Sequence, residues 1–414
     1  MFLFFLLTIY STISIDYTNY KISKLTNSDF NDTKNTPNLI KVNFFDVTIP
    51  SKSDINTIFY PLEFIENYSD MNILDKFETK LSPGEINFLF INKFLENYKK
   101  ENLLVSVRDY YDNNAVDELF KAFSFKNANV TFIPSSLSYI IEESASLNNN
   151  FSKLVINMLG NKTVFNLYNV DYVDNKLNMI KLIKTDTLDF ISDNTIEKII
   201  YKNIYSTLMS QSNYTEEIKT FSNVEDIKNQ IKDNLRSQVN KYEHLECFGQ
   251  KNDGSVVLFS NIMFDLSNIR EEINLISKEI KQKMEEFYGN FVLDENNEPL
   301  IFNSTVIITT LGSELVKDFF NINNLLNIQL QNIVRGGLKY FKIYDKIEDS
   351  RVIKKEILEK SKGSEFLNEL KTYREYQRLK NVEIDFDELN EQDLNNFKKR
   401  IYNTCRKRKF FNRV

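Results

Sequence analysis

Residues 153–170, KLVINMLGNKTVFNLYNV, are the part of this sequence that most constrains its fold. Apolar residues dominate both halves of the segment, and Gly160 lies between them, where a backbone without a Cβ atom can turn sharply. A glycine turn between two strands is one way to bring backbone N–H groups against a phosphate. The segment therefore predicts a strand, a turn and a second strand, and it raises the question of whether the turn binds a nucleotide.

Strand-like and helix-like patterns alternate on both sides of this segment. Strands are predicted in residues 13–25, 40–49, 56–65, 102–112, 129–135, 176–190 and at the start of 304–320. Helices are predicted in residues 82–100, 114–125, 137–147, 266–288 and 330–344, and residues 195–244 are predicted to be largely helical. The alternation occurs twice with a helix-rich insert, so the sequence predicts an α/β protein with two lobes facing a cleft.

The strongest helical period lies in residues 266–288, where apolar residues recur at steps of three and four. The stripe comprises Leu266, Ile269, Ile273, Ile276, Ile280, Met284 and Phe287. We expect it to pack against a sheet and to carry no chemistry.

Length and composition limit the classes of function. The chain has 414 residues, which is enough for two cores, and its formal net charge of −6 gives no reason to expect a nucleic-acid partner. His244 is the single histidine, so we expect neither a histidine-centred metal site nor a serine–histidine triad. Cys247 and Cys405 are far apart in sequence, and we expect two isolated thiols, with pairing in an oxidising compartment as the alternative.

The first residues, MFLFFLLTIYSTISID, hold an apolar run of about nine residues followed by small polar ones, too short to span a bilayer. This pattern predicts a secretory signal peptide in residues 1–14, with a buried first strand as the alternative. No later stretch is apolar enough to predict a transmembrane segment in the mature chain. The expected location is the endoplasmic reticulum lumen or the outside of the cell.

Residues 345–414 differ from the rest. Six acids lie between Glu383 and Asp393, and residues 398–414 carry eight Lys or Arg and no acid. The pattern predicts a charged helical extension. Its basic end is either a solvated tail or a contact for an acidic partner or a membrane surface.

The order of the segments resembles the nucleotide-binding domain of the heat shock protein 70 family, from about Ile15 to Tyr344. Within that family the chain looks most similar to the large branch of the endoplasmic reticulum, the glucose-regulated, hypoxia-up-regulated type. Residues 14–25 are similar to the family's first phosphate hairpin, 153–170 to its second, and 305–320 to its adenosine loop. Residues 102–144 resemble its middle segment, and 330–344 the helix that closes the domain.

The resemblance implies a two-lobed fold of the actin and ribonuclease-H type. Lobe I would span residues 15–150 and lobe II residues 151–344, with a helix-rich subdomain at about 196–300. In the family, Mg-ATP lies between two glycine hairpins whose N–H groups hold the phosphates. The remnant nucleotide-binding candidates that match these motifs are Asp16, Thr18, Asn19, Tyr20, Asn157, Gly160, Asn161, Lys162, Thr163, Gly312 and Ser313.

Several of these positions depart from the family pattern. Asp16 keeps the carboxylate of the first hairpin, but Thr18 replaces its glycine, and Asn19 and Tyr20 replace its threonines. In the second hairpin Asn157 replaces the carboxylate. The substituted glycine positions further along are Leu159, Thr310 and Leu311, and Glu314 stands for the family's adenine-packing arginine.

The family's remaining catalytic groups lack counterparts. Residues 56–70 contain no lysine for the catalytic position, and Ser135–Ser138 stand where the family has Glu-Pro-Thr-Ala. Losing one preorganised donor typically costs about a hundredfold to a thousandfold in rate. We therefore assign no catalytic residue and no metal ligand, and expect ATP binding that is weak or lost, with Mg²⁺ only alongside ATP.

The 70 residues of 345–414 follow Tyr344, too few for the family's β-sandwich and its lid. The resulting hypothesis is a degenerate chaperone-like pseudo-ATPase that assists a lumenal heat shock protein 70 as a co-chaperone or nucleotide exchange factor. One alternative is an ATP-binding chaperone ATPase with divergent loops. Another is a secreted interaction protein on the same fold.

Overall fold

The fold is described from a computed structural model. The described residues are 12–17, 21–26, 34–37, 39–42, 47–48, 57–59, 87, 90–91, 93–95, 102–123, 129–211, 218–221, 223–237, 241–251, 255–289, 304–310, 326–327 and 331–355. They divide into two units, which are described separately. Unit 1 comprises Met1–Val105, Tyr111–Phe132 and Ile353–Val414, and unit 2 comprises Ser106–Tyr110 and Ile133–Val352.

Unit 1 is built on a six-stranded sheet with the strand order β18-β8-β7-β1-β2-β3. The strands are β1 Thr12–Asp16, β2 Lys21–Thr26, β3 Lys34–Pro37, β7 Asn102–Val107, β8 Val130–Pro134 and β18 Ile353–Lys355. Helix α3, Asn113–Phe123, lies between β7 and β8 in the chain, and Phe123 is fully buried against Tyr17. A second sheet, β5-β4-β6, pairs β4 Leu39–Val42 with β5 Val47–Thr48 and β6 Thr57–Phe59.

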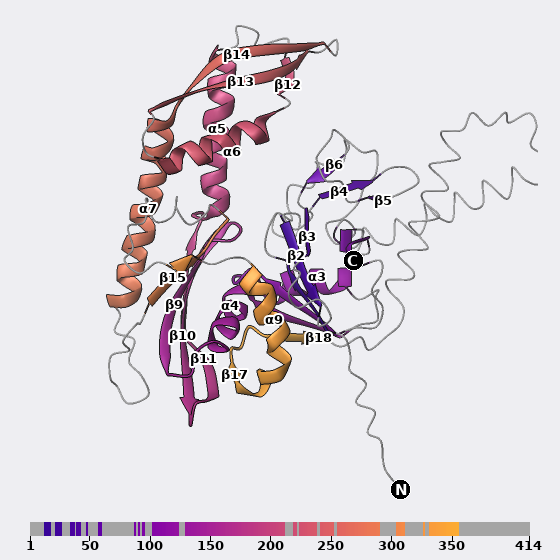
Figure 1. The fold of residues 1–414 in the computed structure, drawn as a ribbon, viewed down its shortest axis with the longest axis vertical. Helices are drawn as coiled ribbons and strands as arrows, with labels where there is room; N and C mark the ends of the chain where they lie inside the picture. Colours follow the sequence, from indigo (N-terminus) through magenta and orange to yellow (C-terminus); the bar gives the residue numbers. More distant parts are fainter. Residues whose placement is uncertain are drawn as a thin grey trace, which may run out of the picture. The chain divides into compact units, whose positions relative to one another are not determined.

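Unit 2 contains another six-stranded sheet, with the order β16-β15-β9-β10-β11-β17. Its strands are β9 Phe151–Asn157, β10 Lys162–Val173, β11 Lys176–Asp189, β15 Ser304–Ile308, β16 Leu326–Asn327 and β17 Ile347–Glu348. Strands β9, β10 and β11 pair antiparallel, whereas β15 pairs parallel to β9 (Figure 1). The predicted strand, turn and strand around Gly160 are thus β9, the 158–161 turn and β10.

The two large sheets share one strand order. In each sheet three consecutive strands form a meander, and the next two strands of that sheet are added beside the first strand of the meander. This order is β3-β2-β1-β7-β8 in unit 1 and β11-β10-β9-β15-β16 in unit 2. The predicted α/β class is confirmed.

Two helices of unit 2 pack closely through a glycine. In α9, Gln331–Ile343, a Cβ atom at Gly336 would overlap the backbone carbonyl of Ser138 in α4, Ser135–Ser144. The ion pair between Lys339 and Glu142, at 2.7 Å, joins the same two helices. Gly336 is therefore present because a side chain would separate α9 from α4.

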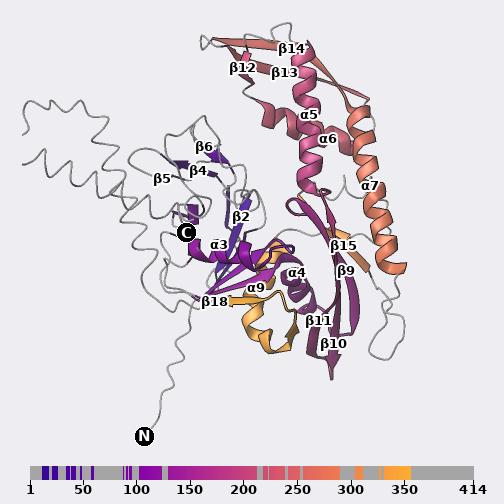
Figure 2. The same cartoon turned by 180° about the vertical axis from the view of Figure 1, so that it is seen from behind.

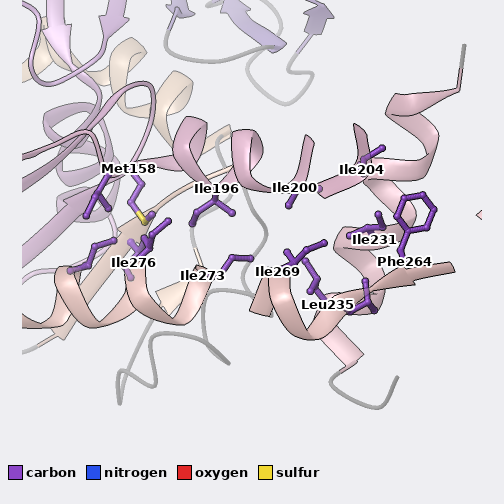
Figure 3. Close-up of a cluster of buried hydrophobic side chains, with 14 of the residues drawn as sticks. Met158, Ile196, Ile200, Ile204, Ile231, Leu235, Phe264, Ile269, Ile273 and Ile276 are labelled. Carbon is purple, nitrogen blue, oxygen red and sulfur yellow. The ribbon is translucent and has the colours of Figure 1, made fainter. Parts of the chain in front are cut away.

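A helical layer follows β11 and forms a hydrophobic core of unit 2. It contains α5 Asp193–Gln211, α6 Val224–Ser237 and α7 Leu266–Gly289, together with a three-stranded sheet. In Figure 3 Ile196 and Ile200 of α5 lie beside Ile269 and Ile273 of α7. The apolar stripe of residues 266–287 is buried in this core, apart from the partly buried Met284.

The three-stranded sheet was not predicted. Its strands are β12 Ile218–Phe221, β13 Tyr242–Lys251 and β14 Val256–Asp265, and Figure 2 shows them beyond the ends of α5 and α7. The prediction that residues 195–244 are largely helical is correct for α5 and α6. It is wrong for β12 and for the start of β13, because residues 218–221 and 242–244 pair as strands.

The ends of the chain differ in part from the sequence-based expectation. Residues 347–348 and 353–355 form β17 and β18, where a helical extension was expected from residue 345. They pair with β11 and β8, and these edge positions favour an extended backbone. The rest of the extension, 356–414, lies outside the described residues. Strand β1 begins at Thr12, within the predicted leader.

Candidate functional site

Three buried side chains anchor the turn between β9 and β10: one amide and two apolar side chains. Asn157 is 2% exposed; its side-chain nitrogen donates to the Ser135 hydroxyl at 2.7 Å, and its oxygen accepts from the Leu159 backbone N–H at 3.1 Å. Met158 and Leu159 are buried, and Met158 belongs to the helical-layer core (Figure 3). An aspartate could not donate to Ser135, so the amide suits this structural role.

Gly160 has the backbone conformation that the sequence predicted for a turn glycine. Its φ of +95° lies in a region that L side chains rarely adopt. A Cβ atom here would lie 2.6 Å from Cδ of Arg108 and nearer still to the hydroxyl oxygen of Tyr110. Two side chains from the segment after β7 therefore cover this face of the turn.

Tyr110 also accepts a hydrogen bond from the backbone of the turn. Its hydroxyl accepts the backbone N–H of Asn161 at 2.9 Å, and Nη1 of Arg108 lies 3.4 Å from the same oxygen. Arg108 is 2% exposed. In a phosphate-binding turn the N–H groups point into open space for the anion. Here an N–H is already bonded and the space above Gly160 is filled, so the residues present do not fit a phosphate at this position.

The next two predicted site residues are engaged elsewhere. Lys162 forms an ion pair with Asp189 at 2.8 Å, and both side chains are about half exposed. Thr163 is fully buried, and its hydroxyl donates to the backbone carbonyl of Ile191 at 2.7 Å. Both residues tie the turn to the end of β11.

The segment after β15 meets the same turn through Asp193, the first residue of α5. The Asp193 carboxylate accepts from the hydroxyl groups of Thr309 and Thr310 and from the Thr310 backbone N–H, at 2.5–2.8 Å. The Asp193 N–H donates to the Met158 carbonyl, and the Asn194 N–H to the Gly160 carbonyl. The turn around Gly160 and the segment after β15 are thus brought together, and the bonds that join them run through the N-terminus of α5.

Burial dominates the electrostatics of Asp193. Loss of solvent raises its pKa to about 6, while the bonds from Thr309 and Thr310 act in the opposite direction and the charge of Glu197 adds to the increase. A carboxyl that titrates near pH 6 suits proton transfer, but Asp193 is 1% exposed and its oxygens accept bonds from Thr309 and Thr310. We therefore interpret Asp193 as a structural residue that holds the segment after β15 against the turn.

A second buried polar cluster lies on β10. It is centred on Arg351, which donates to the side-chain oxygen of Asn166 and to the Tyr168 hydroxyl, both at 2.7 Å. The same guanidinium binds both oxygens of Asp349, at 3.0 and 2.8 Å, and these contacts raise its pKa against the effect of burial. Asp109 completes the cluster by accepting the Asn166 amide at 2.6 Å.

The cluster reaches the start of α4. Asp109 accepts the Ser136 backbone N–H and the Ser135 hydroxyl, both at 3.1 Å, and Ser136 shares a bond with the Tyr168 hydroxyl at 3.0 Å. Burial raises the Tyr168 pKa well above its ordinary value. Ser135 and Ser136 thus serve to join α4, β10 and the segment after β7.

Of the other predicted residues, the structure describes Asp16. Asp16 ends β1 in unit 1 and is fully buried. Thr18, Asn19, Tyr20, Gly312 and Ser313 lie outside the described residues. Sequence reasoning missed Arg108, Tyr110 and Asp109, although the charged and aromatic RDYYD directly after an apolar strand was a signal for them.

Within the ranges described, no group of three or more His, Cys, Asp or Glu side chains could hold a metal ion. Over those same ranges, no helix combines the length and apolar character that crossing a membrane requires. Cys247 is buried, and burial raises its thiol pKa to about 11, so it is not a reactive nucleophile. No protein-family model matches this chain, and none of the curated proteins matches it.

Proposed function

We propose that this chain is a degenerate relative of the heat shock protein 70 family that acts through its surface and not through ATP hydrolysis. The strand order shared by the two large sheets supports two domains of the actin and ribonuclease-H type. The order of segments along the sequence supports the family. In this proposal the chain assists a lumenal heat shock protein 70 as a co-chaperone or nucleotide exchange factor.

The bond between Tyr110 and Asn161 carries the proposal that hydrolysis is lost. In a working phosphate turn this N–H and the space over the glycine belong to the nucleotide. In this chain Tyr110 accepts the N–H, and Tyr110 and Arg108 fill the space over Gly160. The side chain of Asn157 donates to Ser135. Such a role can persist without hydrolysis, because exchange factors act by contact with their partner.

Titration calorimetry with Mg-ATP tests the first half of the proposal. We expect no binding tighter than a Kd of about 10 μM. An authentic heat shock protein 70 in the same buffer is the control for active nucleotide. Tighter binding would instead favour the ATP-binding chaperone, for which the retained positive φ of Gly160 is the supporting observation.

Release of fluorescent ADP from a purified lumenal heat shock protein 70 tests the second half. We expect the release rate to rise with added protein until it saturates, at least about tenfold above the rate without it. An unchanged rate, together with absence of that chaperone from affinity pull-downs and a secreted location, would leave the secreted interaction protein as the better hypothesis.

A further inference from the structure

Among the described strands, the three-stranded sheet of unit 2 has the order β12-β13-β14 (Figure 1). There β14 pairs with β13. In the part of the chain that the structure describes, no strand lies along its other edge. An edge strand presents backbone N–H and C=O groups that can pair with a further strand.

The face of the sheet that points away from the helical layer is apolar beside this edge. On β14 Val256 is 65% exposed and Leu258 51% exposed, and Phe248 of β13 lies directly opposite Leu258. Met263 and Tyr242 are also exposed on these strands. Five of the large apolar side chains that are exposed among the described residues therefore belong to this one sheet. Single exposed apolar residues scattered over a surface are normal, whereas a contiguous apolar patch is typical of an interaction site.

The Val256–Phe259 part of β14 lacks the usual protection against pairing. Strand β14, VVLFSNIMFD, carries no charge before Asp265 and no proline. By contrast, β13 is protected where β12 does not cover it, because the Asn223 side chain donates to the Glu246 carbonyl and accepts the Phe248 N–H. Natural proteins usually protect a long edge with lysine, proline or a bulge. In β14 a bulge at Ser260 and Asn261, where Asn261 has a φ of +65°, interrupts the strand after Phe259.

We propose that the Val256–Phe259 edge of β14 binds the same edge of a second copy of this chain, antiparallel and about a two-fold axis. The two sheets then form one continuous six-stranded sheet. A two-fold axis places each part of the strand against itself, so any charge in it would meet a like charge. The lack of charge from Val256 to Phe264 satisfies this requirement and favours a second copy over a charged partner.

The alternation of side chains fixes the register. Residues directly opposite one another in an antiparallel pair lie on the same face. Val256 and Leu258 both point to the exposed face, so Val256 of one copy lies opposite Leu258 of the other, with Val257 at the axis. The joined faces bury these side chains beside Phe248 of each copy.

Sedimentation of the full chain from about 1 to about 100 μM tests the dimer. We expect a concentration-dependent dimer whose Kd rises at least about tenfold in Leu258→Lys, because two lysines then enter the apolar contact. Leu275→Lys is the matched control, since Leu275 is an exposed leucine on α7 (59%) and should leave the Kd unchanged. A chain that stays monomeric throughout, or equal effects of both substitutions, would refute the proposal.

A cross-link tests the register without relying on Leu258→Lys. Chains carrying Val256→Cys and Leu258→Cys, each in a Cys405→Ser background, are mixed and oxidised. We expect a disulfide-linked pair formed mainly between the two different variants, while the buried Cys247 stays unmodified. No cross-link between them, or one no stronger than that within each variant alone, would rule out this pairing.

Discussion

The hydroxyl of Tyr110 accepts the backbone N–H of Asn161 at 2.9 Å, although 51 residues separate the two in sequence. Tyr110→Phe keeps the ring but leaves this N–H without its acceptor. We expect a loss of about 1–3 kcal/mol in the free energy of unfolding, measured in urea. Tyr242→Phe, at an exposed tyrosine of β13, is the control and should change stability by less than about 0.5 kcal/mol. Equal, small effects would mean that the bond contributes nothing.

Gly160→Ala combines an unfavourable backbone conformation with crowding from Arg108 and Tyr110. Asn175→Ala is the matched control, because Asn175 also has a positive φ, +59°, but lies exposed at the β10–β11 turn. We expect about 1–2 kcal/mol of destabilisation in the control and clearly more in Gly160→Ala. If thermal unfolding gives both variants the same stability, the space over Gly160 is not filled as described.

Arg351→Met leaves the fully buried Asp349 carboxylate without its cation. Breaking a buried pair from one side typically costs about 3–5 kcal/mol, and we expect a loss in this range by urea unfolding. Adding Asp349→Asn to the same chain should restore part of it, since no charge then remains uncompensated. Lys354→Met, at an exposed residue of β18, is the control. A double variant less stable than Arg351→Met would contradict the pairing.

The pKa of Asp193, near 6 in the folded chain, makes stability depend on pH. The unfolded chain has the ordinary value of 3.8, so between about pH 4 and 6 the folded state binds a proton that the unfolded state does not. This group therefore adds stability as the pH falls from 7 to 4, by up to about 3 kcal/mol. Asp193→Asn removes that dependence.

We expect the stability gap between the wild type and Asp193→Asn to widen as the pH falls from 7 to 4 in urea titrations. Asp174→Asn, at the exposed β10–β11 turn, is the control and should run parallel to the wild type. If the curves of the wild type and Asp193→Asn are also parallel, the buried carboxyl does not titrate in this range.

Local patterns predicted much of unit 2. The apolar alternation on both sides of Gly160 identified β9 and β10, and the period of three and four residues identified α7, because each pattern is set by burial on one face. The three-stranded sheet escaped prediction because both faces of β14 carry apolar residues, so no clear alternation marks it.

The function of the site residues was harder to predict. Asn157, Gly160 and Asn161 were placed correctly at one turn, but the groups that occupy the turn come from Arg108 and Tyr110, about 50 residues earlier. Arg351 lies 183 residues from Tyr168 in sequence. Contacts between residues so far apart leave no periodic pattern in the sequence. Only the three-dimensional structure therefore shows that side chains of the same chain fill the space over the turn.

The bond from the Tyr168 hydroxyl to Asp349 closes a loop of 181 residues. Strands β17 and β18, on either side of Asp349, each add the last strand to a different large sheet. During synthesis from the N-terminus neither sheet can therefore be completed until these final strands have emerged. Folding of this chain is therefore expected to finish late, because its two large sheets are closed by contacts between distant parts of the sequence.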